Sequence, residues 1–133
     1  MNAPANTLFG VALPGIPLIE PGDDLAQIIV TALHGAGYTL QTGDALVVSS
    51  KIVSKAEGRI VDLASVQAGD EAHRLAGLTH KDPRIVQLIL NESRTVSRAV
   101  AGVLVTEHRL GFVSANAGID QSNVGGGPDR VLL

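Results

Sequence analysis

Oxygen-bearing side chains gather in one polar segment near the end of the 133-residue chain, at positions 111–123. The segment starts with apolar residues that favour a strand and continues into small and polar ones. Carboxylate, amide and hydroxyl oxygens come close together on Asn116, Asp120, Ser122 and Asn123. Hard cations such as Mg²⁺ bind such oxygens, with phosphate and water completing the shell. Taken alone, this composition favours a strand that ends in an ordinary turn, because Asn, Asp, Ser and Gly are the common turn residues.

A second segment, at positions 49–59, combines hydroxyl groups with positive charge directly after an apolar run. Ammonium and guanidinium groups neutralise phosphate, and hydroxyl groups hydrogen-bond its oxygens. Alone, the pattern is equally typical of a phosphate-binding loop beyond a strand and of a solvated strand with alternating faces. Together the two segments favour a metal–nucleotide site, because metal ions bridge phosphates in phosphoryl transfer. The groups concerned are on Ser49, Ser50, Lys51, Ser54, Lys55 and Arg59.

Composition excludes several classes of protein. A net charge of -3 and an aromatic content of 2% argue against electrostatic attraction to nucleic acid and against base stacking. The chain has no cysteine, which excludes disulfides and thiolate metal sites. No apolar run is long enough to cross a bilayer, and residues 1–9 lack the features of a signal peptide. We therefore expect a cytoplasmic protein with no nucleic-acid or membrane partner.

The apolar periodicity predicts a single α+β domain over residues 1–133, with a mixed, largely antiparallel sheet and helices packed on one side. Residues 1–7 are expected to form a flexible tail. Aspartates mark the expected helix starts, because Asp is a good N-cap. Helices are expected after Asp23 or Asp24, over 70–78 and from Asp82-Pro83, and strands over 8–13, 45–48, 60–63, 96–100, 102–106 and 110–113.

Four segments, at positions 16–25, 50–59, 81–84 and 111–123, resemble the coenzyme F-420:L-glutamate ligase family in order and spacing. The resemblance runs from about Leu13 to the last residue, and four motifs in series are more specific than one. It implies a GTP- and metal-dependent ligase that adds L-glutamate by γ-linkage to the phospholactate tail of a deazaflavin coenzyme F-420 precursor. Mg²⁺ or Mn²⁺, K⁺ and a homodimer are also implied.

The resemblance also implies roles for matching residues. Asp120 would be a metal ligand, and Asp120 and Lys55 would be catalytic. The implied reaction starts when the precursor's carboxylate attacks the γ-phosphate to give an acyl phosphate. The amine of glutamate then displaces phosphate. The implied nucleotide contacts are Ile16, Pro17, Leu18, Ile19, Ser50, Lys51, Lys55 and Asn123.

Members of this family continue well past the position of Leu133, and their later half brings further metal ligands. We therefore expect this chain to correspond to the N-terminal portion, with an incomplete family fold and a missing C-terminal half. Two alternatives stay open: a non-catalytic nucleotide- and metal-binding module, and a truncated fragment without activity alone. A third is a structural domain in which Asp120 and Lys55 only form turns and surface ion pairs.

Overall fold

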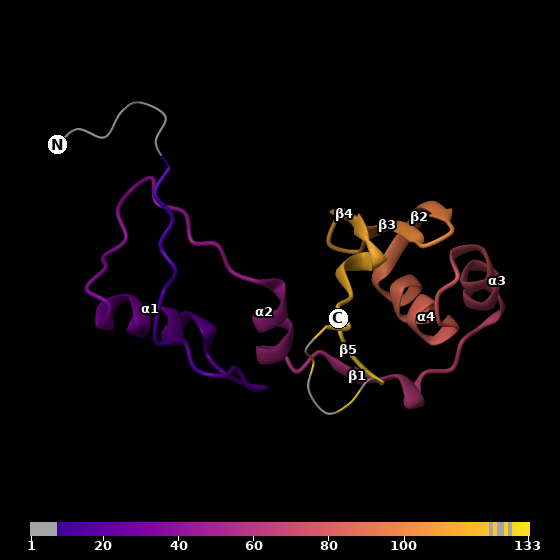
Figure 1. The fold of residues 1–133 in the computed structure, drawn as a ribbon, viewed down its shortest axis with the longest axis horizontal. Helices are drawn as coiled ribbons and strands as arrows, with labels where there is room; N and C mark the ends of the chain where they lie inside the picture. Colours follow the sequence, from indigo (N-terminus) through magenta and orange to yellow (C-terminus); the bar gives the residue numbers. More distant parts are fainter. Residues whose placement is uncertain (1–7, 123, 125–126, 128) are drawn as a thin grey trace.

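The computed structural model describes residues 8–122, 124, 127 and 129–133 (Figure 1). The tail expected at 1–7 therefore lies outside the described residues. Helices combine with two antiparallel sheets, which confirms the expected α+β class. The elements are α1 (Leu25–Gly35), α2 (Ser50–Ala56), β1 (Ile60–Asp62), η1 (Leu63–Ser65), α3 (Asp70–Thr79), α4 (Pro83–Glu92), β2 (Ser93–Val100), β3 (Val103–His108), β4 (Val113–Ala115), η2 (Asn116–Gly118) and β5 (Arg130–Leu132).

The core lies where α3 and α4 pack against the three-stranded sheet β2-β3-β4. Both helices lie on one side of this sheet in Figure 1, as expected from the sequence. Val86 and Ile89 of α4 and Leu104 of β3 are completely buried in one cluster. The predicted start of α4 is confirmed, because the Asp82 carboxylate accepts a hydrogen bond from the backbone N–H of Arg84.

A separate two-stranded sheet connects α2 to the end of the chain. Strand β1 pairs antiparallel with β5, with Ile60 opposite Leu132. The backbone N–H of Leu133 donates to the carbonyl of Arg59 at 3.0 Å, and the Ser54 hydroxyl of α2 donates to the Leu133 carbonyl. The strands therefore form two sheets instead of the one expected, and the smaller sheet fixes the position of α2.

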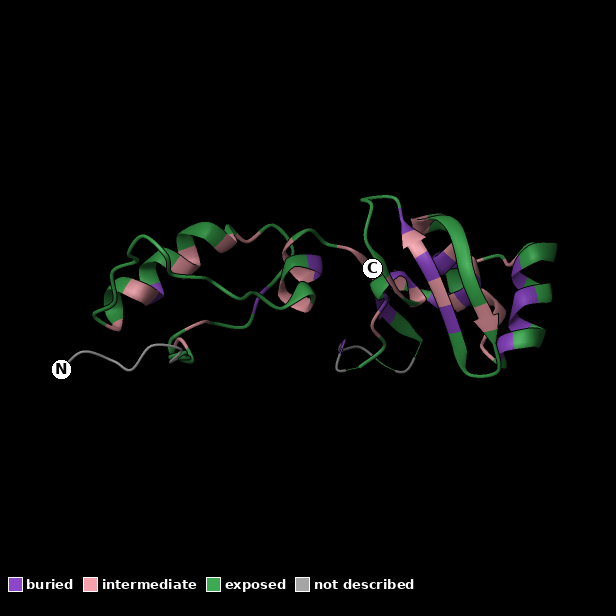
Figure 2. Cartoon of the chain, turned by 90° about the horizontal axis from the view of Figure 1, so that it is seen from above, coloured by how far each residue is buried: buried purple, intermediate pink, exposed green. Residues whose placement is uncertain are grey.

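The predicted strands at 8–13 and 45–48 are wrong, because both segments lack regular secondary structure. Leu8 is 95% exposed and Val47 is 93% exposed, so the run at 45–48 is not buried either. An apolar strand needs neighbouring strands to satisfy its backbone groups and cover its faces. None of the described residues pairs with these two segments. Figure 2 shows that buried residues are concentrated in the part of the chain that contains α3, α4 and the sheets.

The segment at 49–59 is neither the loop nor the strand that the sequence left open, because most of it, Ser50–Ala56, forms helix α2. Ser49 is the N-cap, and Gly58, with φ +66°, follows the helix end in the left-handed conformation that glycine adopts readily. The helix changes which side chains share a face, since residues four apart become neighbours. None of the helices in the described part of the chain has the length and apolarity that a membrane crossing requires.

Candidate functional site

The two polar segments singled out in the sequence meet at Lys51 and Asp120. The Lys51 Nζ lies 2.9 Å from Oδ2 of Asp120 and 3.0 Å from the hydroxyl oxygen of Ser122. It also donates to the backbone carbonyl of Ser122, which is 71 residues away in the chain. The fold therefore joins helix α2 to the oxygen-rich segment. We call Lys51, Asp120 and Ser122 the junction.

A left-handed turn and a strand bridge hold Asp120 in place. Asn116, Ala117 and Gly118 of η2 have φ values of +55°, +53° and +79°, and the N–H of Ile119 donates to the Asn116 carbonyl at 3.0 Å. Such angles are uncommon for residues other than glycine and strained where the side chain is packed. This turn ends β4 and directs the chain back toward β5, beside which Asp120 lies.

Hydrogen bonds from Ser122 organise the Asp120 carboxylate. Its Oδ1 accepts from the Ser122 backbone N–H and from the Ser122 hydroxyl, both at 2.7 Å. These bonds, with a further contribution from the Lys51 ammonium, lower the pKa of Asp120 to about 2. Each of them favours the charged form. Asp120 is therefore a fixed negative charge at neutral pH, and its Oδ2 is the oxygen that faces Lys51.

Lys55 lies one helical turn beyond Lys51 on the same face of α2. Adjacent turns of an α-helix are about 5.4 Å apart, so the backbones of Lys51 and Lys55 are neighbours on this face. The Lys55 carbonyl accepts a hydrogen bond from the Gly58 N–H, but among the described residues no hydrogen bond or ion pair involves the Lys55 ammonium. This ammonium can therefore turn toward an anion placed next to the junction.

Ser50 does not join the junction, because it lies on a different face of α2. With Ser54 it lines a cavity of about 630 Å³ between α2 and the turn after β3. The sequence singled out Arg59 but not its neighbours on the far wall, Glu92 and His108, since no motif or spacing marks them. Arg59 lies 2.9 Å from Glu92, and His108 lies 3.4 Å from the same carboxylate.

The histidine of this cavity has a structural role. Its Nδ1 accepts a hydrogen bond from the backbone N–H of Leu110 at 3.0 Å, so the proton of the neutral ring is on Nε2, which faces Glu92. The ring also stacks on Phe112, with centroids 4.4 Å apart. His108 thus closes the turn between β3 and β4, and both ring nitrogens are used.

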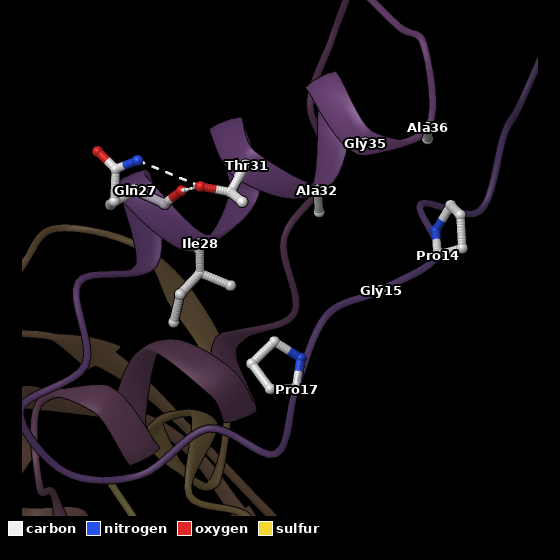
Figure 3. A pocket seen from close by; sticks show the side chains of 9 residues that line it. All are labelled: Pro14, Gly15, Pro17, Gln27, Ile28, Thr31, Ala32, Gly35 and Ala36. Atoms are coloured by element: carbon white, nitrogen blue, oxygen red, sulfur yellow. Dashed lines mark hydrogen bonds between the residues drawn. The ribbon is translucent and has the colours of Figure 1, made fainter.

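Of the segment at 16–19, Pro17 lines a second cavity, of about 570 Å³, between residues 14–17 and α1. Figure 3 shows Pro14 and Pro17 on one side and Ile28 and Ala32 of α1 on the other. The lining is mostly apolar, which suits a flat ring better than a phosphate. Among the described residues, no hydrogen bond joins 16–19 to the junction, but the N–H of Gly22, just beyond, donates to Ala56 of α2 at 2.8 Å.

The structure does not bring all of the sequence-predicted site residues together. Ile19 is buried and Leu18 is 90% exposed, so they face different surroundings. Lys51 and Asp120 are in direct contact, with Lys55 one turn away. Asn123 lies outside the described residues. Ser122 was named among the oxygen-bearing side chains of the segment at 111–123, but its part in holding Asp120 was not predicted, although the spacing Asp-x-Ser is typical of a turn in which Asp accepts from the residue two positions on.

The chemistry of the junction fits a hard divalent cation. Asp120 and Ser122 provide a carboxylate, a hydroxyl and a carbonyl oxygen, and these oxygens already surround one cation, the Lys51 ammonium. No three His, Asp or Glu side chains converge as a metal-binding group within the described part of the chain. Magnesium commonly binds through one or two carboxylates plus phosphates and water, so one fixed carboxylate suffices for this type of site.

Comparison with known proteins leads to the family that the sequence motifs resemble. The family described as F420-0:Gamma-glutamyl ligase matches residues 15–133. The chain is similar to the coenzyme F420:L-glutamate ligase of Methanothermobacter thermautotrophicus, at 45% identity over 88% of this chain and 46% of the relative. It is also similar to that of Halorubrum lacusprofundi, at 44% identity over 92% of this chain and 47% of the relative. The chain thus spans about half the length of the relatives it matches.

Proposed function

This chain belongs to the F420-0:gamma-glutamyl ligase family, and we propose that it supplies the GTP- and metal-binding part of a ligase that adds L-glutamate by γ-linkage to a deazaflavin coenzyme F-420 precursor. One observation supports this proposal above the others: Lys51 and Asp120, predicted for phosphate and for metal, lie 2.9 Å apart. The relatives are named as coenzyme F420:L-glutamate ligases, which supports the choice of substrates.

Asp120 would hold Mg²⁺ or Mn²⁺ through Oδ2, because its Oδ1 is engaged by Ser122. A divalent cation bound there would neutralise negative charge on the phosphates of GTP. Lys55 would face the γ-phosphate and offset the negative charge that grows as it is transferred. Ser122 orients the carboxylate and keeps it ionised.

The cavity beside residues 14–17 would receive the flat part of the nucleotide. Its volume of about 570 Å³ lies within the range of about 300–1,000 Å³ found for small-molecule sites. Its walls from Pro17, Ile28 and Ala32 are apolar, as contact with a ring system requires. The covalent steps are those of an acyl-phosphate ligase. The precursor's carboxylate attacks the γ-phosphorus and releases GDP, and the amine of glutamate then displaces phosphate to leave an amide.

Binding of a fluorescent GTP analogue in the presence and absence of Mn²⁺ tests the nucleotide part of the proposal. We expect metal-dependent binding by the wild-type chain and its loss in Asp120→Asn, which keeps the size of the side chain but removes the charge. Arg74→Met is the control, because Arg74 pairs with Glu71 on the surface of α3. Unchanged metal-dependent binding in Asp120→Asn would contradict the proposal.

A turnover assay with GTP, Mn²⁺, glutamate and the deazaflavin precursor tests the catalytic part. Mass spectrometry of the product would show the addition of one glutamate residue. Binding of nucleotide and metal without turnover by this chain would favour the alternative of a non-catalytic binding module. Failure to bind either one would favour the purely structural alternative.

A further inference from the structure

We propose that Lys51 is a built-in competitor of the divalent cation: its ammonium occupies the cation position on Asp120 and Ser122 and leaves when the metal binds. This inference rests on the metal site proposed above. It concerns a different property, namely which cation holds the site while the nucleotide is absent.

The contacts of Lys51 are those of a cation in a small oxygen cage. Its Nζ contacts a carboxylate oxygen of Asp120, the hydroxyl of Ser122 and the backbone carbonyl of Ser122. An ammonium has three donor hydrogens, and three oxygens satisfy all of them. The cage is therefore full when Lys51 is in place.

The two oxygens of Asp120 are not equivalent, which decides where a metal ion can bind. Oδ1 accepts two hydrogen bonds from Ser122 and points into the turn. Oδ2 is the oxygen left for an external ligand, and Lys51 lies on it. Two cations on one carboxylate oxygen repel each other, so a metal ion and the ammonium compete for Oδ2.

Lys51 is able to leave. The Lys51 and Asp120 side chains are 24% and 36% exposed, so solvent ions can reach the pair. A lysine ammonium is carried on a flexible four-carbon chain, and exposed ion pairs of this kind are weak. The phosphates of a nucleotide bound to the metal would give the displaced ammonium a new partner. The nucleotide should therefore strengthen metal binding, because it stabilises Lys51 away from Asp120.

Titration of Mn²⁺ without nucleotide, followed by the electron paramagnetic resonance of free Mn²⁺, tests the proposal. We expect Lys51→Met to bind Mn²⁺ about tenfold more tightly than the wild type, because a competing charge at contact distance is removed. Lys51→Arg keeps the charge, so its affinity for Mn²⁺ should stay as low as that of the wild type. The double variant Lys51→Met/Asp120→Asn should not show the increased Mn²⁺ affinity. Arg74→Met, which removes a distant charge, should bind Mn²⁺ as the wild type does.

A second measurement does not depend on the variants. The chain has three lysines, Lys51, Lys55 and Lys81, so ¹³Cε-labelled lysine gives three signals. Addition of Mg²⁺ to the wild type should shift the Lys51 signal toward that of a solvated lysine and leave Lys81 unchanged.

The outcomes separate this inference from the proposed function. Equal or weaker Mn²⁺ binding by Lys51→Met, or a Lys51 signal that Mg²⁺ saturating the site leaves unmoved, would overturn the competitor role. If Asp120→Asn still weakened metal binding in that case, the proposed metal site would survive. If neither the wild type nor Lys51→Met bound Mn²⁺ with or without GTP, both proposals would fail.

Discussion

Asp120 and Leu132 exchange both of their backbone hydrogen bonds, at 3.0 Å and 2.8 Å. This bridge ties the turn that carries the carboxylate to β5, and β5 in turn pairs with β1, which closely follows α2. Lys51 and Asp120 therefore reach each other through one short sheet. The geometry of the junction depends on the packing of that sheet as much as on the polar groups themselves.

Leu132→Ala should destabilise the chain and disturb the junction. Leu132 is 1% exposed, and truncation of a buried leucine costs about 2–5 kcal/mol. Urea unfolding followed by circular dichroism measures this loss. Leu110→Ala is the control, because Leu110 is 81% exposed and should change stability by no more than about 0.5 kcal/mol. Equal effects of the two substitutions would contradict the packing described for β5.

Lys55→Met should weaken binding of GTP in the presence of Mg²⁺ by about tenfold, since a hydrogen bond to a charged group is worth about 1.5–3 kcal/mol. Lys55→Arg should recover part of the affinity because it keeps the charge. Isothermal titration calorimetry measures the dissociation constant of GTP for each variant. Arg98→Met removes an exposed charge on β2 and serves as the control. A Lys55→Met chain that bound GTP as well as the control would exclude contact of Lys55 with phosphate.

Asp82 should make the stability of the chain sensitive to acid. The hydrogen bonds from the Arg84 side chain, with those from the backbone, lower the pKa of Asp82 below its usual value of 3.8, although burial opposes them. A carboxylate with a lowered pKa stabilises the native state above its unfolded pKa, and this contribution is lost as pH falls through the folded pKa. Asp82→Asn keeps a capping oxygen but not the charge, so its stability should fall less steeply between about pH 5 and pH 2.

Thermal unfolding of the two proteins across this pH range makes the comparison. Asp82→Ala removes the cap as well and should cost about 1 kcal/mol at neutral pH. If the wild-type and Asp82→Asn curves ran parallel down to pH 2, the Asp82–Arg84 interaction would contribute nothing to folding.

Ala117→Val should be strongly destabilising, while Ala117→Gly should be close to neutral. Ala117 is 4% exposed and has φ +53°. A β-branched side chain is a genuine outlier at such an angle, and strain of this kind costs about 1–3 kcal/mol. Glycine relieves the strain but loses a buried methyl group, and the two effects nearly cancel. Chemical denaturation of both variants gives their free energies of unfolding and checks which is the more stable. A Val variant as stable as the Gly variant would contradict the left-handed turn.

The starts of two helices were predictable from local signals. Asp24 and Asp82 each accept a hydrogen bond from a backbone N–H in the first turn, as Asp at an N-cap predicts. The strand predicted at 45–48 is wrong because no local signal decides the structure of so short an apolar run. Whether four apolar residues form a strand depends on a partner strand, and the sequence of the segment carries no information about one.

Helix α2 shows the limit of periodicity in short segments. Over seven residues, the alternation of Lys51, Val53 and Lys55 fits a strand as well as a helix. The types of the junction residues were predictable, because Lys and Asp suit phosphate and metal. The contact of Lys51 with Ser122 was not, since it joins positions 71 residues apart through the β1–β5 pairing.

Helix α1 buries only Ala32 among its eleven residues, whereas α4 buries Val86, Leu88 and Ile89. Isolated helices shorter than about 12–15 residues are marginal in water. Amide hydrogen exchange should therefore be fast along α1 and approach the global unfolding limit only in α4 and the sheet it covers. The wall of the cavity at Pro17 would then open and close far more often than the core unfolds. A ligand bound in that cavity should appear first as slowed deuterium uptake in α1.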